Sequence, residues 1–214
     1  MITVGIATVP ERADQFKRVL ADLKAQGAVV FGYASHGQKG DFTDAGKFNA
    51  LQYATEGHVL FCDDDLYYPK DYVAKLIEGI DRNPGCVCSF GGGILRDPPI
   101  TSYYHGGRKW KAHCIAHNIP EDMAVNIVGT GVCGWQVGTI QISPEMCPEP
   151  YMADIHLALA AQRQRVPMRL LKHPDNWITH QEIDYAETIW GKFHESDAPM
   201  AKKINDYGKP FEVF

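Results

Sequence analysis

The chain has 214 residues, of which 45% are hydrophobic and 22% are charged, and its formal net charge is -5 at pH 7. These proportions exclude disordered, collagen-like and coiled-coil proteins, and the acidic balance excludes an overall basic field for nucleic acid or anionic lipid. A local basic patch remains compatible with them. We therefore expect a folded chain with a sizeable core.

The amino-terminal residues enter apolar, β-branched sequence at once, which predicts a strand over residues 2–8 and not a signal peptide. No apolar stretch approaches the ~18 residues that a membrane span needs. We therefore expect a cytoplasmic protein with no integral membrane segment. The six cysteines lack CxxC spacing and lie mostly in apolar runs, which favours reduced, buried thiols.

In the first 90 residues, apolar periodicity alternates between strand and helix spacing. This alternation is typical of consecutive βα units and predicts an α/β fold with a Rossmann-like, mostly parallel sheet flanked by helices. Strands are predicted over residues 2–8, 28–34, 58–62 and 86–90, and helices from Pro10 to Gly27, over residues 45–54 and after Pro69.

Beyond residue 90 the regular alternation stops, which predicts a mixed, partly antiparallel second half. Residues 91–93 are three glycines and predict a flexible turn. Short strands are predicted over residues 100–104, 110–115, 125–128, 135–142 and 168–172, a helix over residues 151–164, and loops with short helices over the last 40 residues. No linker or repeat interrupts the chain, so we expect a single domain.

Three consecutive carboxylates, Asp63, Asp64 and Asp65, follow the predicted strand over residues 58–62. Ligands bind at the carboxyl ends of strands in open α/β sheets, and mutual repulsion makes such a cluster costly without a cation. Carboxylates at this place suit Mg²⁺ or Mn²⁺, which bridge protein oxygens to substrate phosphates. The alternative is a solvated acidic turn that caps the following helix.

Several segments together resemble the small GT-A glycosyltransferases related to family 2, which include short bacterial and phage members. The resemblance rests on residues 4–12, which end in Thr8-Val-Pro10-Glu-Arg12, and on residues 61–69, Asp44-Ala-Gly-Lys47, Gly129-Thr130-Gly131 and Met152-Ala-Asp154. It implies one GT-A domain with a nucleotide-binding half over about residues 1–90. An acceptor and catalytic half over about 91–180 and a C-terminal helical segment over 181–214 would follow.

The resemblance also implies residue roles. The aspartate triplet matches the DxD motif of the family, with Asp63 near the nucleoside ribose, Asp65 on the metal and Asp64 orienting its neighbours. Residues 8–12 would border the nucleobase, and Arg12 and Lys47 would meet the charge of the donor. The alternatives are a solvent-facing Arg12 and a surface lysine at 47. The implied donor-binding set is Thr8, Pro10, Arg12, Asp44, Lys47, Asp63, Asp64, Asp65, Gly129, Thr130 and Gly131.

Asp154 lies in the segment where inverting members of this fold carry their general base. An acceptor hydroxyl that attacks an anomeric carbon must lose its proton, which requires such a base. The alternative is a carboxylate stabilised by the helix dipole in a first turn. For residues 129–131 the alternatives are close approach to a sugar and a plain tight turn.

Two further groups extend the expected site. Members of the fold can carry a histidine after the last strand as an additional metal ligand, which makes His173 the first and His180 the second candidate beside Asp65. The patch over residues 103–111 is the strongest aromatic and basic segment, and either binds the acceptor or is surface structure. Trp177 either stacks on a sugar or covers the sheet edge. The expected acceptor-binding set is Tyr104, Arg108, Lys109, Trp110 and Trp177.

These residues predict a glycosyltransferase, dependent on Mn²⁺ or Mg²⁺, that moves a sugar from a UDP- or GDP-sugar to a hydroxyl with inversion. The acceptor stays open among a saccharide, a glycolipid, a protein and a hydroxylated base in phage DNA. A nucleotidyltransferase is an alternative, although residues 8–12 lack the glycines of its phosphate loop. The other alternative is an inactive module that binds a nucleotide sugar. His113 and His117 lack the second ligand pair of a zinc site.

Overall fold

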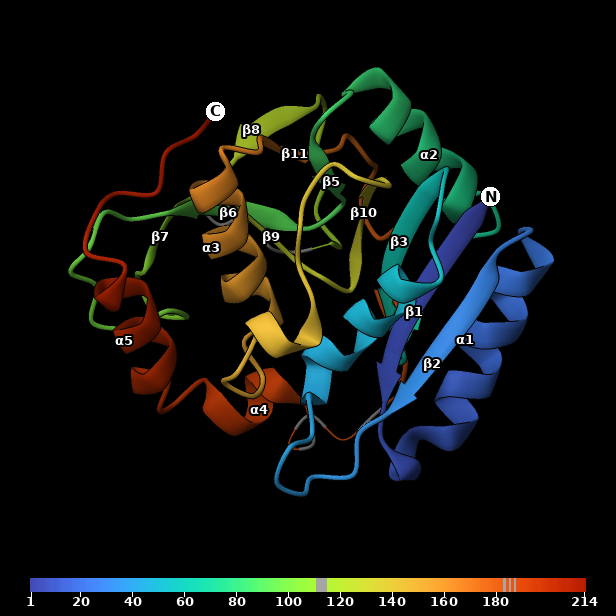
Figure 1. Cartoon of the computed structure of the whole chain (residues 1–214), viewed down its shortest axis with the longest axis horizontal. Helices are drawn as coiled ribbons and strands as arrows, with labels where there is room; N and C mark the ends of the chain where they lie inside the picture. Colours follow the sequence, from blue (N-terminus) through green and yellow to red (C-terminus); the bar gives the residue numbers. More distant parts are fainter. Residues whose placement is uncertain (111–114, 183, 185, 187) are drawn as a thin grey trace.

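The computed structural model describes residues 1–110, 115–182, 184, 186 and 188–214. Its centre is a seven-stranded sheet with the order β2-β1-β3-β10-β5-β11-β8 (Figure 1). These strands are β1 (Ile2–Thr8), β2 (Val29–Ala34), β3 (His58–Asp63), β5 (Val87–Ser89), β8 (Met123–Val125), β10 (Val132–Gln136) and β11 (Met168–Leu170). A three-stranded sheet contains β6 (Gly92–Leu95), β7 (Arg108–Trp110) and β9 (Ile127–Val128), and β4 (Leu66–Tyr67) pairs with β12 (Thr179–His180).

The central sheet is parallel in the first half of the chain, where strand and helix periodicity alternate, and mixed in the second half, where this alternation stops. β1 pairs in parallel with both β2 and β3, and β11 pairs in parallel with β5. β10 is antiparallel to both of its neighbours, and β8 is antiparallel to β11. The structure therefore confirms an α/β fold with a mostly parallel sheet and a mixed second half.

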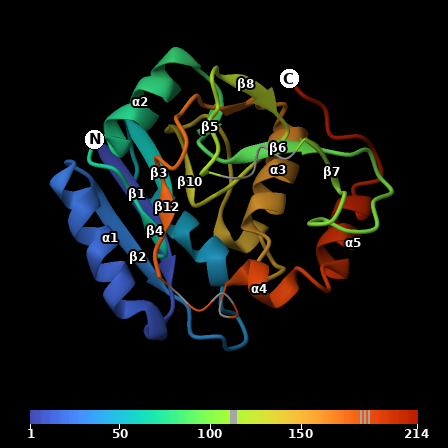
Figure 2. The same cartoon turned by 180° about the vertical axis from the view of Figure 1, so that it is seen from behind.

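Helices cover both faces of the sheet (Figures 1 and 2). The α-helices are α1 (Ala13–Ala25), α2 (Tyr72–Arg82), α3 (Ala153–Gln164), α4 (Ile189–Phe193) and α5 (Ala198–Asp206), and the 3-10 helices are η1 (Pro10–Arg12), η2 (Thr43–Gln52) and η3 (Pro144–Met146). β3 shows why two layers form, because successive side chains of a strand point to opposite faces. Val59 and Phe61 belong to the core with η2 and α3, whereas Leu60 and Cys62 belong to the core with α1 and α2.

Several predicted elements differ in the structure. The helix predicted over residues 45–54 is the 3-10 helix η2, and the three glycines do not form a flexible turn because Gly92 and Gly93 belong to β6. A Cβ at Gly92 would lie 2.7 Å from the backbone oxygen of Ile127, so glycine permits this strand to approach β9. The strand predicted over residues 135–142 ends at Gln136. Residues 111–114 lie outside the described residues, so β7 is described only to Trp110.

Side chains from elsewhere in the fold explain two further differences. Residues 100–104 form no strand, because the backbone of Ile100 bonds to the Asn205 side chain and the Tyr104 amide donates to Asp197. The strand predicted over 125–128 is divided at Asn126. Its side chain accepts from the Leu95 amide at 2.8 Å and donates to the Phe211 carbonyl at 2.9 Å.

The described cysteines are all free and buried, as predicted, and Cys114 lies outside the described residues. In the part of the chain that the structure describes, no helix has the length and apolar character to cross a membrane.

Asp41 holds together the loop that enters η2. Its carboxylate, 2% exposed, accepts hydrogen bonds from the Ser35 hydroxyl at 2.6 Å, the Tyr33 hydroxyl at 2.8 Å and the Thr43 amide at 2.9 Å, and also from the amides of His36 and Gly37. Burial opposes its charge, but these hydrogen bonds hold the pKa of Asp41 well below its usual value. The loop therefore depends on an ionised carboxylate.

We expect Asp41→Ala to lower the free energy of unfolding by about 3 kcal/mol at pH 7, because several buried donors lose their acceptor. A depressed pKa adds stability above the unfolded pKa of about 4, and that stability is lost as the pH falls below it. The difference between wild type and variant should therefore shrink from pH 5 to pH 2.5 in urea unfolding curves. A difference that stays constant over this range would contradict the role of the ionised carboxylate.

Candidate functional site

A cavity of about 970 Å³ opens where β1 and β3 end. These strand ends lie at the lower edge of Figure 1, the edge where α4 also lies. The cavity contains most of the residues predicted for the site, although they come from elements far apart in the sequence. Those that line it are Thr8, Arg12, Asp44, Lys47, Asp63, Asp64, Asp65, Tyr104, Arg108, Gly129, Thr130, Gly131, Asp154 and His180.

Asp64 is a buried anchor between the ends of β1 and β3. Its carboxylate accepts from the Thr8 hydroxyl at 2.7 Å and from Arg12 at 3.0 Å, and Arg12 also contacts Asp65 at 3.1 Å. The Arg12 side chain is only 14% exposed, so the alternative of a solvent-facing arginine is wrong. Asp64 thus joins Thr8 at the end of β1 to Arg12 in η1.

Lys47 is buried beneath the aspartates. Its ammonium group is paired with Asp63, and its side chain is 2% exposed, so the alternative of a surface lysine is wrong. Burial opposes the charge, but Asp63, Asp44 and Asp154 together raise the pKa of Lys47 well above its usual value. The lysine therefore pairs with Asp63 of β3 and interacts electrostatically with Asp44 of η2 and Asp154 of α3.

Two contacts set the position of Asp63. The Tyr68 hydroxyl accepts from the Asp63 amide at 2.8 Å and donates to the Gly131 carbonyl at 2.7 Å, which joins the two segments. A Cβ at Gly131 would lie 2.0 Å from Asp63 Oδ2. Residue 131 must therefore be glycine for the Asp63 carboxylate to occupy this place.

Asp65 completes the acidic group, with a side chain that is 16% exposed. Burial and the neighbouring charge of Asp63 raise the pKa of Asp65 to about 7, although Arg12 opposes the rise. Within the described residues, no three His, Cys, Asp or Glu side chains form a group that could hold a metal ion alone. Asp63 and Asp65 nevertheless fit Mg²⁺ or Mn²⁺ chemically, because these ions commonly take only one or two carboxylates and complete their coordination with water and substrate phosphate.

Asp154 lies in the first turn of α3. Its Oδ1 accepts from both the amide and the hydroxyl of Thr130, at 2.8 Å and 2.7 Å, whereas no described residue donates to Oδ2. Asp44 accepts from the Ala153 amide at 3.0 Å and so caps this helix from η2. Burial raises the pKa of Asp154, although Thr130 and Lys47 oppose the rise. The geometry leaves Oδ2 available to a proton donor in the cavity.

Other predicted residues lie elsewhere. His173 and Trp177 do not join Asp65; they line a separate cavity of about 410 Å³ and pack with Phe90 in the core beside α2. His180 pairs with Leu66 across β12 and β4, and it does line the main cavity. Pro10 is exposed in η1 and is not part of the cavity lining.

The structure describes only some of the remaining predicted residues. The side chains of Lys109 and Trp110 lie outside what the structure describes, as do His113 and Cys114, whereas His117 lines the main cavity.

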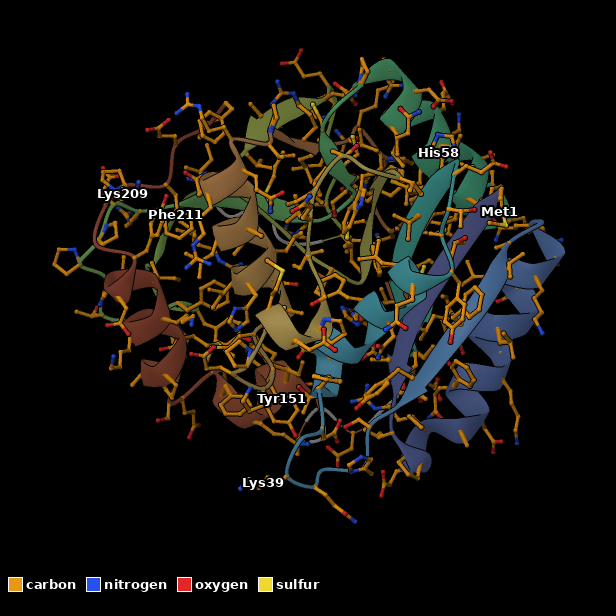
Figure 3. The ribbon with its side chains drawn as sticks, viewed as in Figure 1. Met1, Lys39, His58, Tyr151, Lys209 and Phe211 are labelled. Carbon is orange, nitrogen blue, oxygen red and sulfur yellow. The ribbon has the colours of Figure 1, made fainter. Side chains whose placement is uncertain are left out.

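The prediction missed a second aromatic and basic group, which lines the same cavity as Tyr103, Tyr104 and Arg108 of the predicted patch. Tyr151 belongs to it, as do Trp190 and Lys192 of α4. Figure 3 shows Tyr151 at the start of α3, close to α4, and its ring centroid is 5.5 Å from that of Phe193. The run Trp190-Gly-Lys192 was the available signal, but nothing in the sequence brings it to the end of the sheet.

The cavity thus combines three chemical features. These are carboxylates at a strand end, a buried carboxylate with an available oxygen, and a wall of aromatic and basic side chains. Such a site can bind a cation and an anionic ligand and can accept a proton. A comparison with protein-family models finds no match to this chain, and a comparison with curated proteins finds none either.

Proposed function

We propose that this chain is a glycosyltransferase, dependent on a divalent metal, that transfers a sugar from a UDP- or GDP-sugar to a hydroxyl with inversion. The observation that carries the proposal is the shared cavity, which contains both the carboxylates at the end of β3 and Asp154 at the start of α3. One group serves the donor and the other serves the acceptor. The α/β sheet with a mixed second half is compatible with the GT-A fold that the sequence resembles.

The charge of the donor end supports the need for a metal. Asp44, Asp63, Asp64 and Asp65 line this end, and Lys47 and Arg12 already pair with aspartates. A nucleoside diphosphate would meet net repulsion here without a further cation. Asp65, with Asp63, would hold Mg²⁺ or Mn²⁺. The bound ion would neutralise the charge that develops on the departing diphosphate.

Asp154 would act on the acceptor. In the transfer step the acceptor hydroxyl gives its proton to Oδ2 of Asp154, and its oxygen forms a bond to the anomeric carbon. The bond from that carbon to the diphosphate oxygen breaks, and the electron pair leaves with the nucleoside diphosphate. Thr130 stabilises the conformation by holding Oδ1. Burial favours proton uptake by this carboxylate.

The test is to incubate the protein with UDP- and GDP-sugars, Mn²⁺ and a panel of hydroxyl acceptors. Mass spectrometry should detect a glycosylated product, and NMR should show an inverted anomeric configuration. Nucleotide-sugar binding without any transfer or hydrolysis would instead indicate an inactive binding module. Release of pyrophosphate from a nucleoside triphosphate would indicate a nucleotidyltransferase.

The contact between Gly131 and Asp63 gives a separate prediction. Gly131→Ala should weaken UDP or GDP binding in Mn²⁺ by about tenfold or more, because the added Cβ must displace the Asp63 carboxylate. Wild type measured under the same conditions is the reference. Calorimetry with a nucleotide affinity equal to that of wild type would contradict this role for Gly131.

A further inference from the structure

Two cations line the cavity apart from the aspartates. Arg12 and Lys47 are in ion pairs, whereas Arg108 and Lys192 have no carboxylate of the described residues within 4.0 Å. Arg108 Nε is buried and lacks a hydrogen-bond partner among the described residues. A guanidinium and an ammonium group that line a cavity without a neutralising carboxylate are suited to an oxyanion, which can accept charge-assisted hydrogen bonds from both.

The cavity wall that carries Arg108 and Lys192 is held in place by contacts with neighbouring residues. Arg108 lies over the Tyr103 ring, with its guanidinium carbon 4.0 Å from the ring centroid. Asp197 accepts from the Ser102 hydroxyl at 2.8 Å and from the Tyr104 amide at 2.6 Å, and the backbone oxygen of His194 lies 2.7 Å from His105 Nε2. These contacts join the segment before β7 to the segment after α4. Arg108 and Lys192 are therefore presented by one connected structure.

This wall lies toward Asp154. Tyr103 is buried beneath Arg108, and burial raises its pKa to about 12; Arg108 opposes the rise and the charge of Asp154 adds to it. Lys192 Nζ lies 6.0 Å from the ring centroid of Tyr151, three residues before Asp154. The aspartates at the end of β3 belong to the donor end. An anion on the Arg108 wall would consequently sit on the acceptor side of the transfer.

We propose that Arg108 and Lys192 form an anion subsite for the acceptor, which would be a saccharide that carries a phosphate or carboxylate group near its reacting hydroxyl. The proposal rests on the proposed function for its assignment to the acceptor. Trp190, 46% exposed, also lines this side, and the ring of His194 stacks on it at 4.2 Å. An aromatic surface beside two cations suits a sugar ring with an attached anionic group.

Calorimetry in metal-free buffer with EDTA tests the subsite. The probes are inorganic phosphate, glucose 6-phosphate, glucuronate and neutral glucose, so that the two anionic groups are distinguished. We expect glucose 6-phosphate or glucuronate to bind wild type more tightly than glucose. Arg108→Gln and Lys192→Gln should each weaken anion binding by about tenfold, since each removes a charge-assisted contact. Arg108→Lys should retain part of the affinity, and thermal melting should show that each variant is folded.

Two control variants remove matched cations outside the cavity. Arg165 lies over the Phe214 ring and also pairs with Glu212, and Lys209 lies over the Tyr207 ring, so Arg165→Gln and Lys209→Gln each lose a contact between a cation and an aromatic ring. Figure 3 shows Lys209 well away from Tyr151. Both controls should bind the anionic probes like wild type. No preference for an anionic probe, or an equal loss in the controls, would overturn the subsite.

UDP and GDP titrations in Mn²⁺ separate the subsite from the donor. Arg108→Gln and Lys192→Gln should change nucleotide affinity by less than twofold, and a parallel tenfold loss would overturn the assignment to the acceptor. If wild type binds no nucleotide, the proposed function fails, whereas the metal-free anion titrations still decide whether the subsite exists.

Discussion

Asp154→Asn is expected to lower kcat by about 10²- to 10⁴-fold while leaving donor and metal affinity nearly unchanged. Asparagine keeps an oxygen for the two hydrogen bonds from Thr130 but cannot take a proton at the position of Oδ2. Asp44, and not Asp154, caps the amide of Ala153, so the helix start should survive. The loss should therefore be chemical and not a result of unfolding.

The measurement is steady-state kinetics with the best donor and acceptor, together with calorimetry of nucleotide binding. Asp14→Asn is the matched control, because Asp14 also lies in the first turn of a helix but is exposed and paired with Lys17. This control should keep the kcat of wild type. Near-normal kcat in Asp154→Asn would assign the carboxylate to structure alone. A product with retained anomeric configuration would contradict the inverting mechanism.

Asp65→Asn is expected to remove the effect of Mn²⁺ on UDP or GDP binding, a loss of about 10²-fold in the affinity measured with the ion present. The substitution preserves size and removes the charge that would hold the cation. Asp64 still pairs with Arg12, so the end of β3 should keep its conformation. Affinity measured in EDTA should be equal to that of wild type or somewhat higher, because the substitution removes one negative charge near the diphosphate.

Calorimetry in matched Mn²⁺ and EDTA buffers provides this comparison. Asp71→Asn is the control, since Asp71 is an exposed aspartate that lines the separate smaller cavity. It should retain the full effect of Mn²⁺. If wild type itself binds nucleotide equally in Mn²⁺ and EDTA, the metal assignment is wrong whatever the variant shows.

Local sequence patterns were sufficient to predict much of the fold. The strands β1 and β3 and the helices α1 and α2 lie close to their predicted places, because each has a clear apolar period with a breaker near its end. α3 also lies close to its predicted place, although most of its residues are buried. The short strands of the second half were harder. Asn126 interrupts its strand through partners near residues 95 and 211, and no local pattern reports contacts so distant in sequence.

The acidic end of the candidate site could be predicted because strand ends in α/β sheets converge, so an acidic run after β3 must meet the end of β1. The sequence also indicated Asp154 and the aromatic and basic patch. It did not distinguish a surface lysine from the buried Lys47, since Asp63, which pairs with it, comes from a separate element. His173 and Trp177 follow the last strand of the sheet, which is where the predicted metal ligand and sugar-binding residue were expected. They nevertheless pack beside α2 and do not join Asp65.

The sequence by itself thus determined the α/β class, the alternation of the first half and the acidic end of β3, because hydrophobic period and strand polarity are local properties. Only the tertiary structure decided which charges are neutralised. Arg12 and Lys47 are held by aspartates, whereas Arg108 and Lys192 face the cavity without such partners among the described residues. Ion pairing depends on distances between side chains that the fold brings together, and those distances are set by packing across the whole chain.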